Sequence, residues 1–144
     1  MFDWSHSEIV KILDMPDRVV IQDITNLEWE QEEGTAKATV LGKDKKKNSR
    51  SFEIKFNWGR GVILSSQESD HLGIFNAKKN FEPFLQPNVY EVLNSPIINN
   101  WAETEAVFEA SKEHQRHFMI CADAELLNVI DTDLPKISEV TYAH

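Results

Sequence analysis

The clearest alternation of apolar and polar positions lies in residues 51–58. Phe52, Ile54, Phe56 and Trp58 occupy every second position there, with polar or charged residues between them. Successive side chains of a strand point to opposite faces. The segment therefore predicts an antiparallel strand that packs one face on a core and exposes the other to water.

Neighbouring segments extend this strand into a sheet. Residues 18–31 predict one long strand or two shorter ones, and residues 35–41 predict the returning arm of a hairpin that turns near Gly34. A turn at residues 59–61 leads into a further strand that begins at Val62. We expect a meander of about four antiparallel strands at the centre of the fold.

Helices are expected on either side of this meander. Ser5 or Ser7 can cap a helix that covers residues 5–15 and ends at Pro16, with Ile9, Ile12 and Leu13 on one face. A second start signal is the pair Ser95-Pro96, a cap followed by proline at the first helical position. One or two helices are predicted between residues 88 and 110.

The C-terminal region predicts a hairpin made of residues 116–122 and 126–130, followed by a loop-like tail with Ile137 and Val140 as its last core contacts. No internal repeat or linker interrupts the chain. The predicted fold class is therefore α+β, as a single globular domain of residues 1–144 with an N-terminal helix, a meander and a C-terminal hairpin.

Charge changes this picture, because it is unevenly distributed. The net charge is −9, yet residues 34–60 carry eight basic and two acidic side chains, while residues 1–33 carry two basic and nine acidic ones. A net negative chain repels phosphates at long range and attracts basic partners, so nucleic acid is disfavoured as a ligand. The basic stretch from Lys43 to Arg50 contains no aromatic residue for base stacking, and a soluble hairpin tip is its default interpretation.

The compartment is also constrained by composition. No apolar run is long enough to span a bilayer, no signal peptide is visible, and Cys121 is the single cysteine. These features predict a protein of the reducing cytoplasm that does not contact a membrane.

Enzyme motifs are mostly missing from the sequence. There is no phosphate-binding loop and no nucleophile elbow, so no catalytic residue, cofactor or metal ion is predicted. An alternative is a metal-dependent enzyme or small-ligand binder that uses His114, His117 and Cys121, with Asp123 or His71 as a further ligand. On a strand, His117 and Cys121 would share a face but lie about 13 Å apart, too far for one ion.

A row of carboxylates is the most suggestive surface feature. Glu28, Glu30 and Glu32 share one predicted strand face, and Trp29 and Glu33 adjoin them. Carboxylates about 7 Å apart repel one another. The row is either a solvated strand face that Lys37 and the basic loop offset, or a surface that docks a basic partner.

These observations favour a stoichiometric protein-binding module over an enzyme. The leading hypothesis is a small acidic inhibitor, of the kind that bacterial immunity proteins and antitoxins represent, which masks a basic partner such as a nuclease toxin domain. Its predicted partner-binding residues are Glu28, Trp29, Glu30, Glu32 and Glu33. The chain would be a monomer or weak dimer. A structural or assembly subunit, whose strands pair with copies of itself, is a further alternative.

Overall fold

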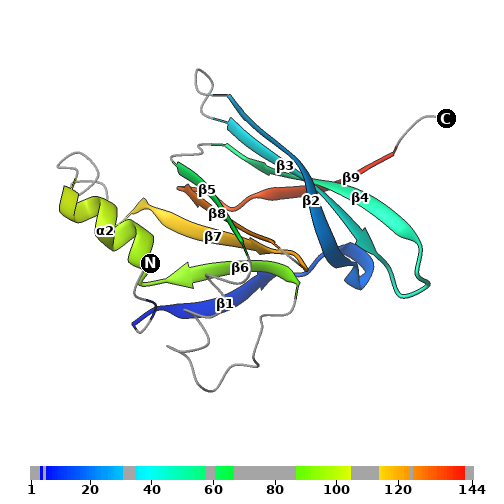
Figure 1. The fold of residues 1–144 in the computed structure, drawn as a ribbon, viewed down its shortest axis with the longest axis horizontal. Helices are drawn as coiled ribbons and strands as arrows, with labels where there is room; N and C mark the ends of the chain where they lie inside the picture. The colour runs from blue at the N-terminus through cyan, green and yellow to red at the C-terminus, as the bar shows by residue number, and fades with distance from the viewer. Residues whose placement is uncertain are drawn as a thin grey trace.

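The protein folds into two antiparallel β-sheets with one α-helix in the part of the chain that the computed structural model describes (Figure 1). The described residues are 4, 6–30, 35–57, 61–66, 87–104, 114–123 and 125–141. Sheet A has the strand order β1-β6-β7-β8-β5. Its strands are β1 (Glu8–Leu13), β5 (Gly61–Ser66), β6 (Asn88–Leu93), β7 (Arg116–Cys121) and β8 (Glu125–Asp131).

Sheet B has the strand order β2-β3-β4-β9. Its strands are β2 (Val20–Glu30), β3 (Thr35–Lys43), β4 (Ser49–Phe56) and β9 (Lys136–Val140). A 3-10 turn, η1 (Pro16–Arg18), joins β1 of sheet A to β2 of sheet B. The helix α2 (Pro96–Thr104) follows β6.

One hydrophobic core contains side chains from both sheets. Sheet B contributes alternate residues of β3 and β4, among them Val40, Phe52 and Phe56, and sheet A contributes residues such as Phe118 and Val129. The rings of Phe56 and Phe118 lie 6.0 Å apart between their centroids. The alternation that predicted the residue 51–58 strand therefore marks the face of sheet B that packs on sheet A.

The opposite face of sheet A is buried as well. Trp4, Tyr90, Met119, Cys121 and Leu126 form a second cluster there. Because both faces of β7 are covered, its apolar residues run almost without interruption instead of alternating.

The predicted hairpin of residues 18–31 and 35–41 is confirmed as β2 and β3, and β4 continues it in the same sheet. The prediction that the strand beginning at Val62 is the fourth strand of the meander is wrong, because this strand, β5, pairs with β8 in sheet A. Strand β9 takes that place beside β4, so the tail that was predicted as a loop is partly a strand. Ile137 in this strand packs against the core, as expected.

The N-terminal helix is a wrong prediction. Residues 8–13 form β1, which pairs with β6 through neighbours such as Ile9 and Val92. Three of its six residues are β-branched, and a short isolated helix is marginal, so pairing with a sheet edge outweighs the helical spacing. Ser7 caps no helix; its hydroxyl donates to the carbonyl oxygen of Trp4 at 2.7 Å.

The helical turns predicted for residues 88–94 are wrong too, because Asn88–Leu93 is the strand β6 between β1 and β7. The helix start at Ser95-Pro96 is confirmed, since α2 begins at Pro96 and the Ser95 hydroxyl accepts a hydrogen bond from the Ile98 amide at 3.2 Å. With two sheets and one helix in the described residues, the fold is mainly β, and the α+β class is corrected accordingly.

The C-terminal hairpin is confirmed as β7 and β8, which pair in register from Arg116–Asp131 to Cys121–Leu126. The part of the predicted helical region that follows Thr104 lies outside the described residues. Among those residues, no helix has the length and apolarity needed to cross a membrane.

Candidate functional site

The predicted acidic row begins on the face of sheet B that points away from the core, which we call the outer face. Glu28 and Glu30 are exposed there, on the edge strand β2. Trp29 lies between them in the sequence only, since its register position is opposite the core residue Ala36 and not on the outer face. Glu32 and Glu33 lie outside the described residues.

Lys37 offsets part of this acidic row. Its ammonium nitrogen lies 3.4 Å from a carboxylate oxygen of Glu28 and 3.5 Å from one of Glu53. The two carboxylates raise the pKa of Lys37, Glu28 contributing more than Glu53. Glu28 is thus engaged within its own sheet, as the interpretation of a solvated strand face expects.

Across the sheet, the charge of the outer face changes sign. The β-ladder places Glu28 opposite Lys37, Lys37 opposite Lys55, and Lys55 opposite Lys136. The lysines of this cross-strand row lie toward β9, while Glu28 and Glu30 lie at the β2 edge. Along this row the charge changes from acidic at the β2 edge to basic at the β9 edge, with Glu53 of β4 as a further carboxylate beside Lys37.

The residues of the enzyme alternative do not converge. His114 and Asp123 are exposed near opposite ends of β7, whereas His117 and Cys121 are buried within that strand. Burial raises the pKa of the Cys121 thiol to about 12, so a thiolate is disfavoured. In the described part of the chain, no group of three metal-ligating side chains is arranged to hold an ion. His71 is not among the described residues.

Both ring nitrogens of His117 are engaged in a buried polar chain. Nδ1 lies 2.7 Å from the Ser95 hydroxyl, and Nε2 lies 2.8 Å from the Asn128 side-chain oxygen. Because that oxygen can only accept, Nε2 carries the proton and donates. Nδ1 then accepts from Ser95, whose oxygen accepts in turn from the Ile98 amide.

The hydrogen bond between Ser95 and His117 is like the serine–histidine contact of a hydrolase, but a substrate cannot reach these side chains. Ser95, His117 and Asn128 are all buried. Burial lowers the pKa of His117 to about 4, against the opposite effects of Asn128 and Glu91. A neutral histidine with two hydrogen-bonding partners joins the N-terminal cap of α2 to β7 and β8. This role is structural.

A partly buried ion pair lies at the end of sheet A. Arg116 donates two hydrogen bonds of 2.7 Å to the carboxylate of Glu91, and its guanidinium lies over the ring of Phe118. Asp131, opposite Arg116 in the ladder, is fully buried.

Sequence reasoning missed the roles of Ser95, Asn128 and Arg116 as partners of buried groups. A signal did exist for Asn128, since asparagine is a poor strand former yet interrupts the apolar run of residues 126–130. A polar residue inside such a run needs a buried hydrogen-bonding partner. The partner itself comes from a strand pairing that the sequence does not reveal.

Comparisons with protein-family models, curated proteins and solved structures found no match to this chain, so the geometry of the described residues is the basis for any functional assignment.

Proposed function

We propose that the protein is a stoichiometric binding module that docks a basic partner protein against the β2 edge of the outer face. The observation that carries this proposal is the change of charge across sheet B, from Glu28 and Glu30 on β2 to Lys55 and Lys136 toward β9. The comparisons lend no support to a toxin-specific role, so the partner is defined by its charge alone.

The change of charge across the outer face would orient a docked partner. Complementary potentials steer encounter and fix orientation, and like charges that face each other suppress wrong poses. A basic partner surface is attracted at Glu30 and repelled at Lys136, so its footprint is centred on the β2 edge. Glu30 is better suited than Glu28 to this role, because Glu28 already contacts Lys37.

The alternative of strand pairing between copies is less well supported. Strand β2 is the longest described edge, but its ladder is irregular at two places, between Ile21 and Asp23 and between Ile24 and Asn26. Bulges and exposed charged residues discourage edge-to-edge pairing. Binding through side chains of the outer face suits this strand better than addition of a further strand.

The proposal can be tested with a short oligolysine peptide as a probe. Backbone amide shifts recorded by NMR at low salt should change saturably at residues 28–30, with little change at residues 136–138. Glu30→Lys should weaken the binding about tenfold, because it replaces an attraction by a repulsion. Added salt should weaken wild-type binding as well.

Glu8→Lys is the matched control, since it makes the same charge change at an exposed position of sheet A. It should leave the affinity for oligolysine within about twofold of wild type, a difference well below 1 kcal/mol. Equal losses in both variants would mean that the peptide senses only net charge, and the β2 edge would then have no special role.

A further inference from the structure

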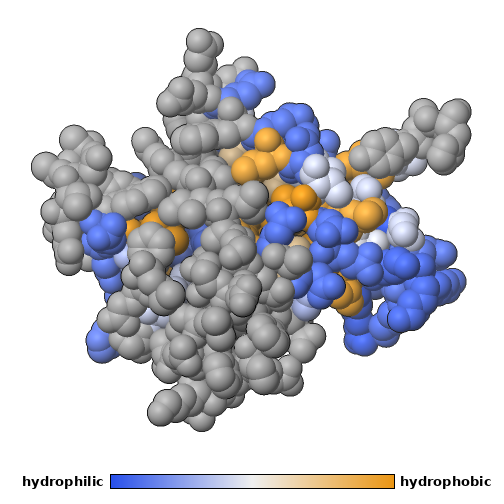
Figure 2. All heavy atoms as spheres, viewed as in Figure 1, coloured by the Kyte–Doolittle hydropathy of each residue, from blue (hydrophilic) through white to orange (hydrophobic). Residues whose placement is uncertain are grey.

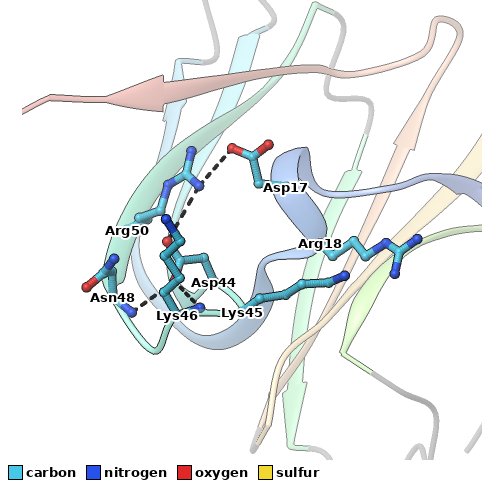
Figure 3. A pocket seen from close by; sticks show the side chains of 7 residues that line it. All are labelled: Asp17, Arg18, Asp44, Lys45, Lys46, Asn48 and Arg50. Atoms are coloured by element: carbon cyan, nitrogen blue, oxygen red, sulfur yellow. Dashed lines mark hydrogen bonds and ion pairs between the residues drawn. The ribbon is translucent and has the colours of Figure 1, made fainter.

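A charged cavity of about 550 Å³ lies at the end of sheet B, between η1 and the connection from β3 to β4 (Figure 3). It lies at the end of the molecule where hydrophilic residues gather in Figure 2. Every described side chain that lines it is polar or charged, and four of these are cationic: Arg18, Lys45, Lys46 and Arg50.

Arg50 is occupied by the protein's own carboxylates. Its guanidinium donates to Glu139 through two nitrogens at 2.8 Å each, and to Asp17 at 2.8 Å. Asp44 lies 3.8 Å away and also accepts from the amides of Lys46 and Asn48. The two acidic residues of the lining, Asp17 and Asp44, are therefore committed to Arg50 and to the backbone.

The other three cations have no such engagement among the described residues. The ion pairs found in this part of the chain include none that involves Arg18, Lys45 or Lys46. Figure 3 shows the side chains of Arg18, from η1, and Lys45, from the connection between β3 and β4, extending in the same direction. Like charges gathered in this way repel each other, and an anion between them removes that cost.

The backbone fixes this arrangement. Asp17 and Arg18 both have left-handed φ angles, 54° and 56°, which are uncommon for residues other than glycine. The turn is held by hydrogen bonds from the amides of Arg18 and Val19 to the carbonyls of Met15 and Pro16. It directs Asp17 to Arg50 and leaves Arg18 on the cavity wall.

We propose that this cavity binds a small compound that carries two or more phosphate groups. Arginine forks and lysine ammonium groups are the usual protein ligands of phosphate oxygens. The volume exceeds that of a single phosphate and lies in the range of small-molecule sites. The described residues of the lining include no aromatic side chain to stack on a base, so the phosphate chain itself is the part that they recognise.

This site is independent of the proposed function. It recognises the opposite charge, and its cavity is lined by residues of η1, the connection from β3 to β4, and β4, none of which belongs to the acidic edge. Failure of oligolysine binding would leave the anion site untouched, and failure of the anion site would leave the β2 edge untouched.

The test is a calorimetric titration of the full chain with sodium tripolyphosphate at roughly 20 mM salt. We expect saturable one-to-one binding. Lys45→Glu should weaken it at least about tenfold, which corresponds to about 1.4 kcal/mol. Arg18→Gln should weaken it as well, and NMR amide shifts should change at residues 18 and 44–48.

Lys55→Glu is the control, because it makes the same charge change on the outer face, away from the cavity lining. It should preserve tripolyphosphate binding. Equal weakening by Lys45→Glu and Lys55→Glu, or the absence of saturable binding, would overturn the site. Tighter binding of a single-stranded oligonucleotide through the same residues would also overturn the assignment to a small phosphate compound.

Discussion

At the scale of single residues, His117 shows how a buried titratable group makes stability depend on pH. In the folded protein its pKa is lowered to about 4 by burial, whereas in the unfolded chain it is about 6.5. Between these values the unfolded chain binds the extra proton. The stability that the neutral histidine contributes is therefore present above pH 6.5 and is lost as the pH falls toward 4.

This linkage predicts a loss of about 3 kcal/mol of unfolding free energy from His117 between pH 6.5 and pH 4. Urea unfolding at a series of pH values measures it. His117→Gln should lower the stability at pH 7 but flatten the slope over this range. His114→Gln, at an exposed histidine, should keep the wild-type slope. A His117→Gln slope equal to that of wild type would contradict the buried, neutral state of this histidine.

A second prediction concerns Gly42 in β3. A Cβ atom built at this position lies 2.5 Å from the carbonyl oxygen of Val20 and 2.5 Å from a methyl group of Val19. The carbonyl belongs to the paired strand and cannot move aside freely. Gly42→Ala should therefore destabilise the fold by about 1–3 kcal/mol, measured by denaturant unfolding. Thr39→Ala, at a half-buried position of the same strand, is the comparison, and an equal effect would argue against the close approach.

At the scale of elements, the pair of Arg116 and Glu91 joins β7 to β6. Arg116→Met should leave the Glu91 carboxylate without its two charged hydrogen bonds in a nearly buried position. We expect a loss of about 2 kcal/mol. Thermal unfolding measures the effect, and Arg116→Lys should restore part of it. A neutral outcome for Arg116→Met would show that water replaces the guanidinium.

The elements also show what the sequence could predict. Strands β2, β3, β4, β7 and β8 have clear patterns and near partners in the chain, and the cap at Ser95 is a local signal. Strands β1, β6 and β9 depend on partners far away in sequence, such as Val92 for Ile9 and Ile54 for Ile137. A short apolar run with helical spacing does not say which sheet it will join, so long-range pairing overrode the local pattern.

The candidate sites, too, could be predicted only where they depend on local sequence patterns. The acidic row of β2 was visible in the sequence, because alternation alone places Glu28 and Glu30 on one face. The change from acidic to basic charge across sheet B was not visible. It depends on the register that places Lys37, Lys55 and Lys136 in one cross-strand row, and on the pairing of β9 with β4. The contact of Arg18 and Lys45 with one cavity likewise depends on where η1 lies against the β3–β4 connection.

At the scale of the whole molecule, sheet B carries two separate charged regions. The outer face of sheet B carries carboxylates at its β2 edge, and the cavity at one end of that sheet gathers cations, while one core joins the sheets beneath them. A rigid sheet holds such charges at fixed spacing, which favours recognition by complementary surfaces.

The most direct test of this account compares two opposite charge changes on the outer face. A basic protein that the wild-type chain captures is titrated against Glu30→Lys and Lys136→Glu at the same salt concentration. We expect about tenfold weaker binding for Glu30→Lys and equal or tighter binding for Lys136→Glu. Unchanged affinity for Glu30→Lys, or weaker binding for Lys136→Glu, would contradict it.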